Sequence, residues 1–178
     1  MAASKESNSK MQHTVSAWFA KSARDLPWRK ESTPWGRLIS EFMAQQTQIV
    51  RVAQRWPVMM KQFPTPLSMS LQDEQEVLKH WQGLGYYRRA KQLKSTADMI
   101  VKDFEGKVPS TVEALLKLPG VGRYTAGAVA SIAFNQRVPI VDANVHRVLS
   151  RIENKAGTPS PCSWSWELAD QLVQNADR

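Results

Sequence analysis

The sequence predicts an all-α protein. Apolar residues recur at helical spacing along most of its 178 residues, and proline and glycine interrupt the pattern at intervals. No alternating apolar and polar run is long enough to indicate a strand. No apolar run approaches the roughly 20 residues of a membrane span, and the polar N-terminus lacks the apolar segment of a secretory signal. These features are typical of a soluble, intracellular globular protein.

The first part of the chain predicts two helices separated by a proline break. Residues 1–10 are polar and are expected to be disordered. A helix over residues 11–23 ends before Pro27, because a residue that precedes proline disfavours helical geometry. Thr33 and Pro34 then predict an N-cap followed by proline at the first helical position. This second helix carries an apolar face of Leu38, Ile39, Phe42 and Met43.

The next helix is expected to begin at Thr47, which can act as an N-cap, and to run through Trp56. Pro57 lies inside the same pattern and predicts a kink. Residues 63–66 contain two prolines and predict a linker.

The remaining elements alternate helices with glycine-containing or proline-containing turns. Further helices are expected over residues 71–81, 86–104, 110–116, 124–134, 142–149 and 164–175. Ser110 and Glu113 match a capping box at the start of one of them, and Gly106 ends the longest. Residues 138–141 are expected to be extended, and residues 154–163 form a loop rich in proline, serine and glycine.

The net charge of +8 comes from 24 basic and 16 acidic residues, which favours a polyanionic partner or, equally, a solvated basic surface. Residues 32–72 contain one acid, Glu41, and residues 114–152 contain one acid, Asp142. Two isolated carboxylates in basic stretches are candidates for acid–base chemistry. A first-turn acid and a helix cap explain them equally well.

The turn Leu118-Pro-Gly-Val-Gly122 joins two predicted helices. Gly120 and Gly122 allow positive φ and leave the backbone amides of the turn uncovered. Amides at a helix N-terminus suit a phosphate group, and Lys117 and Arg123 flank the turn with positive charge. The alternative is an ordinary glycine-rich helix–helix turn. The motif with its basic flanks favours phosphate binding, and a phosphate contact positions a protein on DNA without reading sequence.

Four separated motifs resemble the helix-hairpin-helix DNA glycosylase superfamily. The motifs are Ser40-Glu-Phe-Met-Ala-Gln-Gln-Thr-Gln48, Gly83-Leu-Gly-Tyr-Tyr87, Leu118-Pro-Gly-Val-Gly122 and Val141-Asp-Ala-Asn-Val145. Together they are similar to the adenine (MutY-type) branch, which removes adenine mispaired with 8-oxoguanine, and the similarity runs from about residue 26 to 151. The resemblance implies two helical subdomains with a cleft between them.

The resemblance also implies roles for individual residues. The catalytic residues would be Glu41, Asp142 and Tyr124, and the DNA-binding residues Gln46, Thr47, Tyr86, Gly120, Val121, Gly122, Arg123 and Asn144. The base pocket would be lined by Leu26, Trp28, Arg29 and Ile49. In this scheme a neutral Glu41 protonates adenine and an ionised Asp142 stabilises the cationic sugar. Tyr124 stands where the bifunctional branch has a nucleophilic lysine, which implies a monofunctional glycosylase.

The resemblance implies four segments: a disordered tail (1–10), an N-terminal helix packing with the C-terminal subdomain (11–27), a six-helix subdomain (28–135) containing the hairpin (111–134), and a partial second subdomain (136–178). The family carries a [4Fe–4S] cluster, but its four cysteine ligands are absent here and Cys162 matches none of them. A monovalent cation at the hairpin is also implied. No other metal site is expected.

Two departures from the family pattern concern the base pocket and the C-terminus. Ala44 replaces the usual leucine and leaves one side of the pocket less filled. The family's 8-oxoguanine recognition domain is absent, so the chain is expected to be truncated. The implied partner is double-stranded DNA with mismatched or oxidised base pairs, bound by a monomer in the nucleoid of a bacterium, or in the nucleus or mitochondrion of a eukaryote.

Two other functions remain open from the sequence. A glycosylase for thymine in G·T mismatches can also carry tyrosine at the position of Tyr124. Alternatively, the chain is a non-catalytic DNA-binding remnant, which the missing cysteines favour and the presence of Glu41 and Asp142 disfavours.

Overall fold

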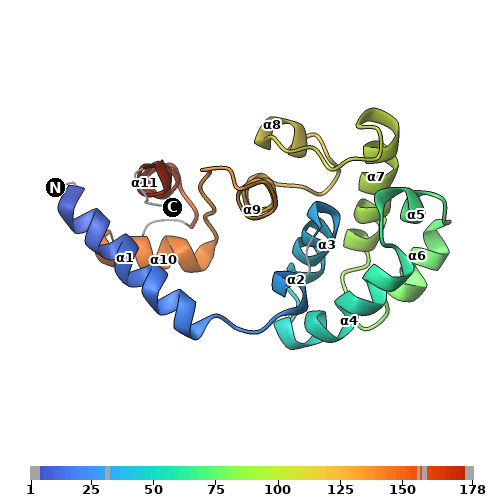
Figure 1. The fold of residues 1–178 in the computed structure, drawn as a ribbon, viewed down its shortest axis with the longest axis horizontal. Helices are drawn as coiled ribbons and strands as arrows, with labels where there is room; N and C mark the ends of the chain where they lie inside the picture. The colour runs from blue at the N-terminus through green and yellow to red at the C-terminus, as the bar shows by residue number, and fades with distance from the viewer. Residues whose placement is uncertain (1–4, 31–32, 156, 158–159, 175–178) are drawn as a thin grey trace. The chain divides into compact units, whose positions relative to one another are not determined.

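The computed structural model describes residues 5–30, 33–155, 157 and 160–174. These residues form helices and no strand (Figure 1), as the sequence predicts. The helices are α1 (Lys5–Ser22), α2 (Pro27–Lys30), α3 (Pro34–Ala44), α4 (Ile49–Gln62), α5 (Pro66–Ser70), α6 (Glu74–His80), α7 (Arg88–Asp103), α8 (Val112–Leu115), α9 (Arg123–Phe134), α10 (Ala143–Ile152) and α11 (Ser163–Gln174). In the part of the chain that the structure describes, no helix has the length and apolar character needed to cross a membrane.

The helices fall into two compact units. One is continuous and spans residues 26–135, and the other combines the chain up to residue 25 with the chain from residue 136 onward. The continuous unit therefore holds α2 to α9, and the discontinuous unit holds α1, α10 and α11.

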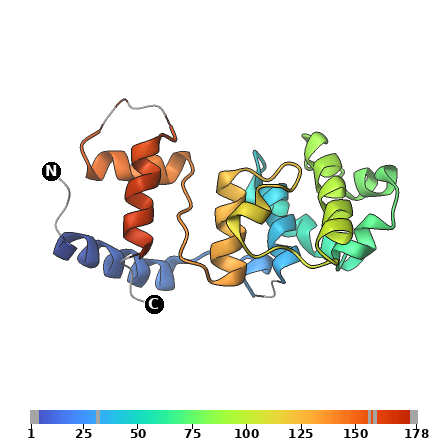
Figure 2. The same cartoon turned by 90° about the horizontal axis from the view of Figure 1, so that it is seen from above.

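The core of the continuous unit is built on α3 and α7. The apolar face predicted for α3 is fully buried, as is the predicted face of α7, which consists of Ala90, Leu93, Ala97 and Ile100. Helices α5 and α6 pack against α7 (Figures 1 and 2). Helix α9 packs against α3, and its small buried residues let the two backbones approach closely.

The core of the discontinuous unit consists of Val141, Leu149, Trp166 and Ala169, with Trp164, Leu168 and Leu172 packed against it. The Gln12 side-chain amide on α1 donates a hydrogen bond to the Leu172 carbonyl on α11. The apolar residues of α1 at helical spacing remain exposed: Val15, Trp18 and Phe19 are 56%, 62% and 49% exposed.

Several sequence predictions of element starts are wrong. The helix predicted from residue 71 begins at Glu74, after the N-cap Asp73. Residues 5–10 are helical rather than disordered, because extending a helix is easier than nucleating one; residues 1–4 lie outside the described residues. Thr47 does not cap α4, whose N-cap is Gln48. The cap of α8 is Thr111 rather than Ser110, and its hydroxyl accepts from the Ala114 amide at 3.3 Å.

Two short helices lie where the sequence predicts a break and a linker. Helix α2 begins at Pro27, a favourable first helical residue. Helix α5 follows a capping box formed by Thr65 and Ser68 within the predicted linker region. The predicted caps Thr33 and Asp142 are confirmed by their hydrogen bonds to the Gly36 and Val145 amides.

Candidate active site

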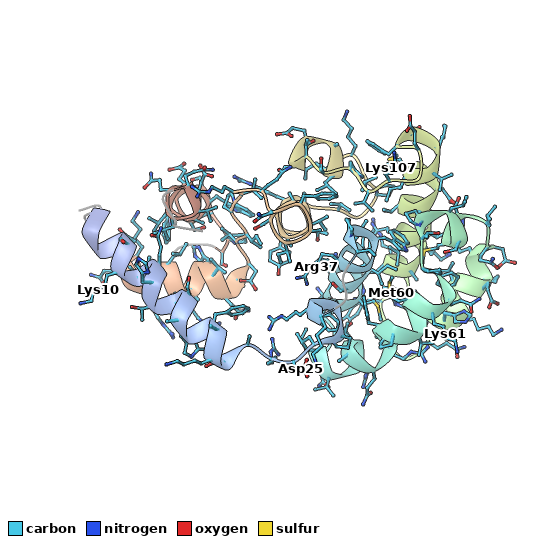
Figure 3. All side chains as sticks on the ribbon, viewed as in Figure 1. Lys10, Asp25, Arg37, Met60, Lys61 and Lys107 are labelled. Atoms are coloured by element: carbon cyan, nitrogen blue, oxygen red, sulfur yellow. The ribbon has the colours of Figure 1, made fainter. Side chains whose placement is uncertain are left out.

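Glu41 lies in the last turn of α3, and its side chain is 13% exposed. Burial raises the pKa of the Glu41 carboxyl above its ordinary value, and the Arg37 guanidinium opposes that rise. The two groups are one helical turn apart, with Arg37 Nη1 3.9 Å from Glu41 Oε1 (Figure 3 labels Arg37). Glu41 is thus a carboxyl that the protein holds toward its protonated form, as a general acid requires.

Tyr124 and Arg29 belong to the same neighbourhood as Glu41. Both act electrostatically on Arg37: Arg29 lowers its pKa and Tyr124 raises it, after burial and Glu41, which have larger effects. Tyr124 is the second residue of α9 and is 40% exposed. Of the other residues predicted for the base pocket, Leu26 and Trp28 are buried at 6% and 5% exposed, and Ile49 is partly buried at the start of α4. Leu26 and Trp28 therefore belong to the apolar interior of this unit, where the centroid of the Trp28 ring lies 6.3 Å from that of Trp56.

Gln46 and Tyr86 share an uncommon backbone conformation. Their φ values are 51° and 47°, in the left-handed region that residues other than glycine seldom adopt. Both side chains are exposed, Tyr86 at 62%. Such outliers persist where surrounding structure holds them, and they cluster at functional sites.

The group that holds these two residues in place is Arg89, which the sequence reasoning missed. Its Nη1 donates to the carbonyls of Phe42 (2.8 Å), Met43 (2.9 Å) and Gln45. Its Nη2 donates to the Thr47 hydroxyl and to the Leu84 and Gly85 carbonyls, at 2.9, 3.2 and 3.1 Å.

The Arg89 guanidinium also lies 5.2 Å from the Trp81 ring centroid and 5.5 Å from that of Tyr86. One buried side chain therefore joins the loop of Gln46 and Thr47 to the loop of Tyr86. The sequence contained a signal for its burial, because Arg89 lies at helical spacing from Leu93, Thr96 and Ile100. The structure shows that all four residues are buried.

The predicted hairpin lies between α8 and α9. The Val121 amide donates to the Leu118 carbonyl at 3.1 Å, and the Thr96 hydroxyl donates to the Pro119 carbonyl at 2.7 Å, which ties the turn to α7. Gly120 has φ +76°, as expected. Gly122 has φ −93° and is the extended N-cap of α9, so it does not use the positive φ that glycine allows.

The residues predicted to bind a phosphate at the hairpin differ in their exposure. Gly120, Gly122, Lys117 and Arg123 are exposed, whereas Val121 is 7% exposed and anchors the turn. The first amides of α9 have no side-chain cap and can donate to an anion.

Asp142 belongs to the discontinuous unit, where it caps α10. Its Oδ1 accepts from the Val145 amide at 2.8 Å, and its Oδ2 accepts from the Asn144 side-chain amide at 3.0 Å. The side-chain oxygen of Asn144, Oδ1, in turn accepts from Arg147 Nη2 at 2.9 Å. The predicted residues Asp142 and Asn144 therefore form one hydrogen-bonded group.

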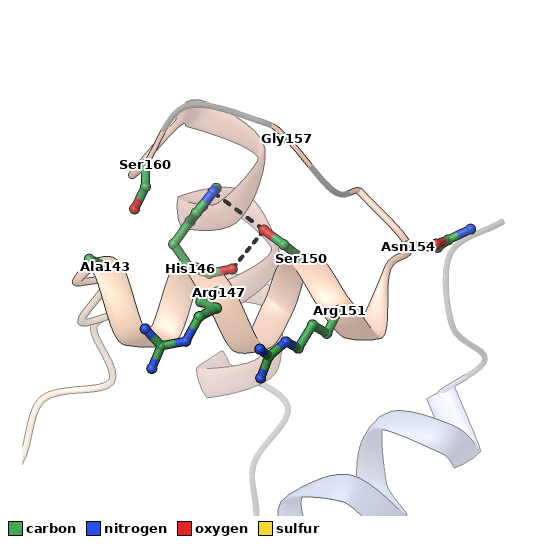
Figure 4. A pocket seen from close by; sticks show the side chains of 8 residues that line it. All are labelled: Ala143, His146, Arg147, Ser150, Arg151, Asn154, Gly157 and Ser160. Atoms are coloured by element: carbon green, nitrogen blue, oxygen red, sulfur yellow. Dashed lines mark hydrogen bonds between the residues drawn. The ribbon is translucent and has the colours of Figure 1, made fainter.

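A hollow of about 560 Å³ runs along α10 (Figure 4). Its wall includes Arg147, Arg151 and His146, whose Nε2 is 3.3 Å from the Ser150 hydroxyl. The Ser150 hydroxyl donates to the His146 carbonyl at 2.8 Å.

The sequence that forms this site matches the model of a known protein family. The model for the HhH-GPD superfamily of base excision DNA repair proteins matches residues 39–168, which include Glu41, the hairpin and Asp142. The chain belongs to this superfamily.

Individual relatives are named glycosylases. Over 148 residues the chain is 48% identical to the adenine DNA glycosylase of Mycobacterium tuberculosis, covering 81% of this chain and 49% of that protein. It is 43% identical over 172 residues to the adenine DNA glycosylase of Rattus norvegicus, covering 90% of this chain and 33% of that protein. The chain thus spans half or less of the length of these relatives. A solved structure of a thermostable thymine-DNA glycosylase matches with a TM-score of 0.85 at 30% identity, covering 92% of this chain and 76% of the other.

The residues present do not fit the iron–sulfur cluster that the resemblance to the superfamily implies. A [4Fe–4S] cluster is held by four cysteine thiolates, and the sequence contains one cysteine. That residue, Cys162, lies beside a histidine, with its Sγ 4.0 Å from His146 Nδ1. Among the described residues, no three histidine, cysteine or acidic side chains are grouped to hold a metal ion.

Proposed function

We propose that this HhH-GPD protein is a monofunctional DNA glycosylase that releases adenine paired with 8-oxoguanine or guanine in duplex DNA. The observation that carries the proposal is the environment of Glu41, a buried carboxyl with a raised pKa at the end of α3. The similarity to adenine DNA glycosylases at up to 48% identity supports the choice of base.

Glu41 would supply the proton that adenine needs as a leaving group. When the N-glycosidic bond breaks, its electron pair goes to the base and leaves a cationic, oxocarbenium-like sugar. A neutral Glu41 donates its proton to a ring nitrogen of adenine, so that the base departs uncharged. Water then adds to the sugar and loses a proton, which leaves an abasic site.

Asp142 would stabilise the cationic sugar as a carboxylate, a division of labour between two carboxyl groups that also occurs in glycoside hydrolysis. Its hydrogen bonds from the Val145 amide and the Asn144 side-chain amide fix the orientation of the carboxyl group. Tyr124 carries no amine, so a Schiff base cannot form there, and strand cleavage should not accompany excision.

DNA binding would use the hairpin and the two loops joined by Arg89. The amides around Gly122 and the charge of Lys117 and Arg123 suit a phosphate. Tyr86 and Gln46 are exposed on fixed loops and would fill the space that the extruded adenine leaves. A monovalent cation at the hairpin carbonyls, and a monomer on double-stranded DNA, belong to the same proposal.

The test uses duplexes with adenine opposite 8-oxoguanine, adenine opposite guanine, and thymine opposite guanine. Each is incubated with the protein, and abasic sites are then cleaved with alkali. We expect product from the two adenine duplexes, little cleavage without alkali, and no borohydride-trapped protein–DNA adduct in high yield. If no duplex gives product, the glycosylase proposal is wrong and the chain is a non-catalytic DNA-binding module.

Two variants assign the chemistry. Glu41→Gln and Asp142→Asn should each abolish excision while DNA binding persists. Asparagine caps a helix as well as aspartate does, so Asp142→Asn should leave α10 intact. Full activity in either variant would contradict its assigned role.

A second candidate is a thymine glycosylase acting on G·T mismatches, which the likeness to the thermostable thymine-DNA glycosylase favours. Product from the thymine duplex alone would decide for it.

A further inference from the structure

A second charged side chain is buried beside Glu41. Arg37 is 6% exposed, and the 3.9 Å between its Nη1 and Glu41 Oε1 is an ion-pair distance but too long for a hydrogen bond. Its Nε is buried and has no hydrogen-bond partner in the part of the chain that the structure describes. Burying a guanidinium with unused donors is unfavourable, so its place next to the candidate acid suggests a role in the reaction.

Several polar groups on the helices around α3 bond elsewhere or act on Arg37. On α7, Arg89 bonds to loop carbonyls. On α4, Arg51 and Arg55 donate to the Gly83 and His80 carbonyls at 3.2 and 2.7 Å. Arg29 on α2 and Tyr124 on α9 both act on Arg37. Within the described residues, Arg37 is therefore the cation in ion-pair contact with Glu41.

We propose that Arg37 is a positioning residue for Glu41, which holds the carboxyl group in place and stabilises the carboxylate that remains after the proton has passed to the leaving base. The proposal rests on the proposed role of Glu41 as general acid.

The physical reason lies in the balance between burial and charge. Burial alone favours the neutral carboxyl, so it keeps Glu41 protonated but also makes its proton harder to release. The guanidinium opposes that effect. Once Glu41 is ionised, the Arg37 guanidinium, which is already in ion-pair contact with it, can form a charge-assisted hydrogen bond at small further cost in reorganisation.

The test is the pH dependence of single-turnover adenine excision from the duplex with 8-oxoguanine. Excision needs protonated Glu41, so the rate falls as pH rises through its pKa. Arg37→Met removes the cation, and we expect the midpoint to move up by about one pH unit. Below the midpoint the rate should fall by about three- to tenfold, because a weaker acid donates less readily. Arg37→Lys keeps the charge and should keep the midpoint close to that of the wild type.

Arg55→Met is the matched control. Among the described residues, the buried Nε of Arg55 also has no hydrogen-bond partner, but no carboxylate forms an ion pair with Arg55. Its midpoint should equal that of the wild type. Where Arg37→Met gives too little folded protein, Arg37→Gln replaces it. A purely structural role of Arg37 would reduce the amount of active protein without moving the midpoint, and that result would overturn the proposal.

A carbon-13 NMR titration of the Glu41 carboxyl separates this inference from the proposed function. We expect a higher Glu41 pKa in Arg37→Met than in the wild type. An unchanged pKa would overturn the role of Arg37 even in an active enzyme. Absence of excision by the wild type, with the NMR shift present, would refute only the glycosylase function.

Discussion

At the scale of single residues, the main feature is a carboxyl group that the fold disfavours in its charged form. Glu41 is in the last turn of α3, between the buried Ser40 and Phe42, where water reaches little of its side chain. This placement lowers stability at the pH where the carboxyl is charged. The same placement provides a proton donor.

The first prediction concerns stability and pH. The ordinary pKa of Glu41 is 4.5 and the folded-state pKa is higher, so the native state holds the proton to higher pH than the unfolded state does. Stability therefore falls as pH rises from about 4.5 through the folded-state pKa. Glu41→Gln removes this loss. We expect its melting temperature to exceed that of the wild type at pH 8 and to converge with it toward pH 4.

The control is Glu113→Gln, at an exposed position on α8 where water solvates the side chain in both states. A melting-temperature difference for Glu41→Gln that is the same at pH 4 and pH 8 would contradict the prediction.

At the scale of elements, the hairpin gives two glycines with different requirements. A Cβ on Gly120 would lie 2.9 Å from Gln92 Oε1 and 2.9 Å from Phe42 Cε1, at φ +76°. A Cβ on Gly122 would meet nothing within 4 Å, at an ordinary φ. The turn therefore requires glycine at position 120 for its backbone conformation and its packing. At position 122 the protein has room for a larger side chain.

The second prediction follows from this difference. Gly120→Ala should reduce the free energy of unfolding by about 1–3 kcal/mol, measured by urea denaturation. Gly122→Ala should reduce it by no more than about 1 kcal/mol, because alanine is a poorer N-cap than glycine but meets no steric conflict there. A weaker affinity of folded Gly122→Ala for duplex DNA would support a phosphate next to this glycine. Equal stability losses in the two variants would contradict the geometry of the turn.

The third prediction concerns the two loops joined by Arg89. Arg89→Met leaves several loop acceptors without a donor, so we expect a loss of at least about 3 kcal/mol in the free energy of unfolding. In the folded fraction, amide hydrogen exchange should become faster in both loops that Arg89 contacts, at Thr47 in one and at Tyr86 in the other. Arg88→Met is the control, since Arg88 is exposed, and it should change stability by less than about 0.5 kcal/mol. Faster exchange in one loop alone would argue against the coupling.

Local signals predicted the elements well, and long-range contacts escaped prediction. The caps Thr33 and Asp142 and the buried face of α7 depend on residues a few positions apart, so spacing reveals them. The sequence alone suggests that Arg89 belongs to a basic surface. Its contacts with the two loops could not be predicted, because its hydrogen-bond acceptors lie in residues 42–47 and 84–85. The burial of Glu41 was likewise hidden, since it arises from the packing of α3 against other helices.

At the scale of the whole molecule, the net charge of +8 predicts that the affinity for DNA falls as the salt concentration rises. Each phosphate contact made by a cation contributes about −0.9 to the slope of log K against log salt for duplex DNA. Lys117→Met should therefore make that slope less steep by about one unit. Lys61→Met, at an exposed position in the last turn of α4, is the control and should leave the slope unchanged. An unaltered slope for Lys117→Met would remove Lys117 from the DNA contact.

The division into a continuous and a discontinuous unit has a consequence for biosynthesis. Residues 26–135 emerge from the ribosome as one uninterrupted stretch and can assemble as soon as they are complete. Helix α1 is synthesised before this stretch, whereas α10 and α11, which belong to the same unit as α1, are synthesised after it. Folding of the intervening stretch shortens the loop that must close before they meet. The unit that holds Glu41 can thus fold before all the segments of the unit that holds Asp142 have been synthesised.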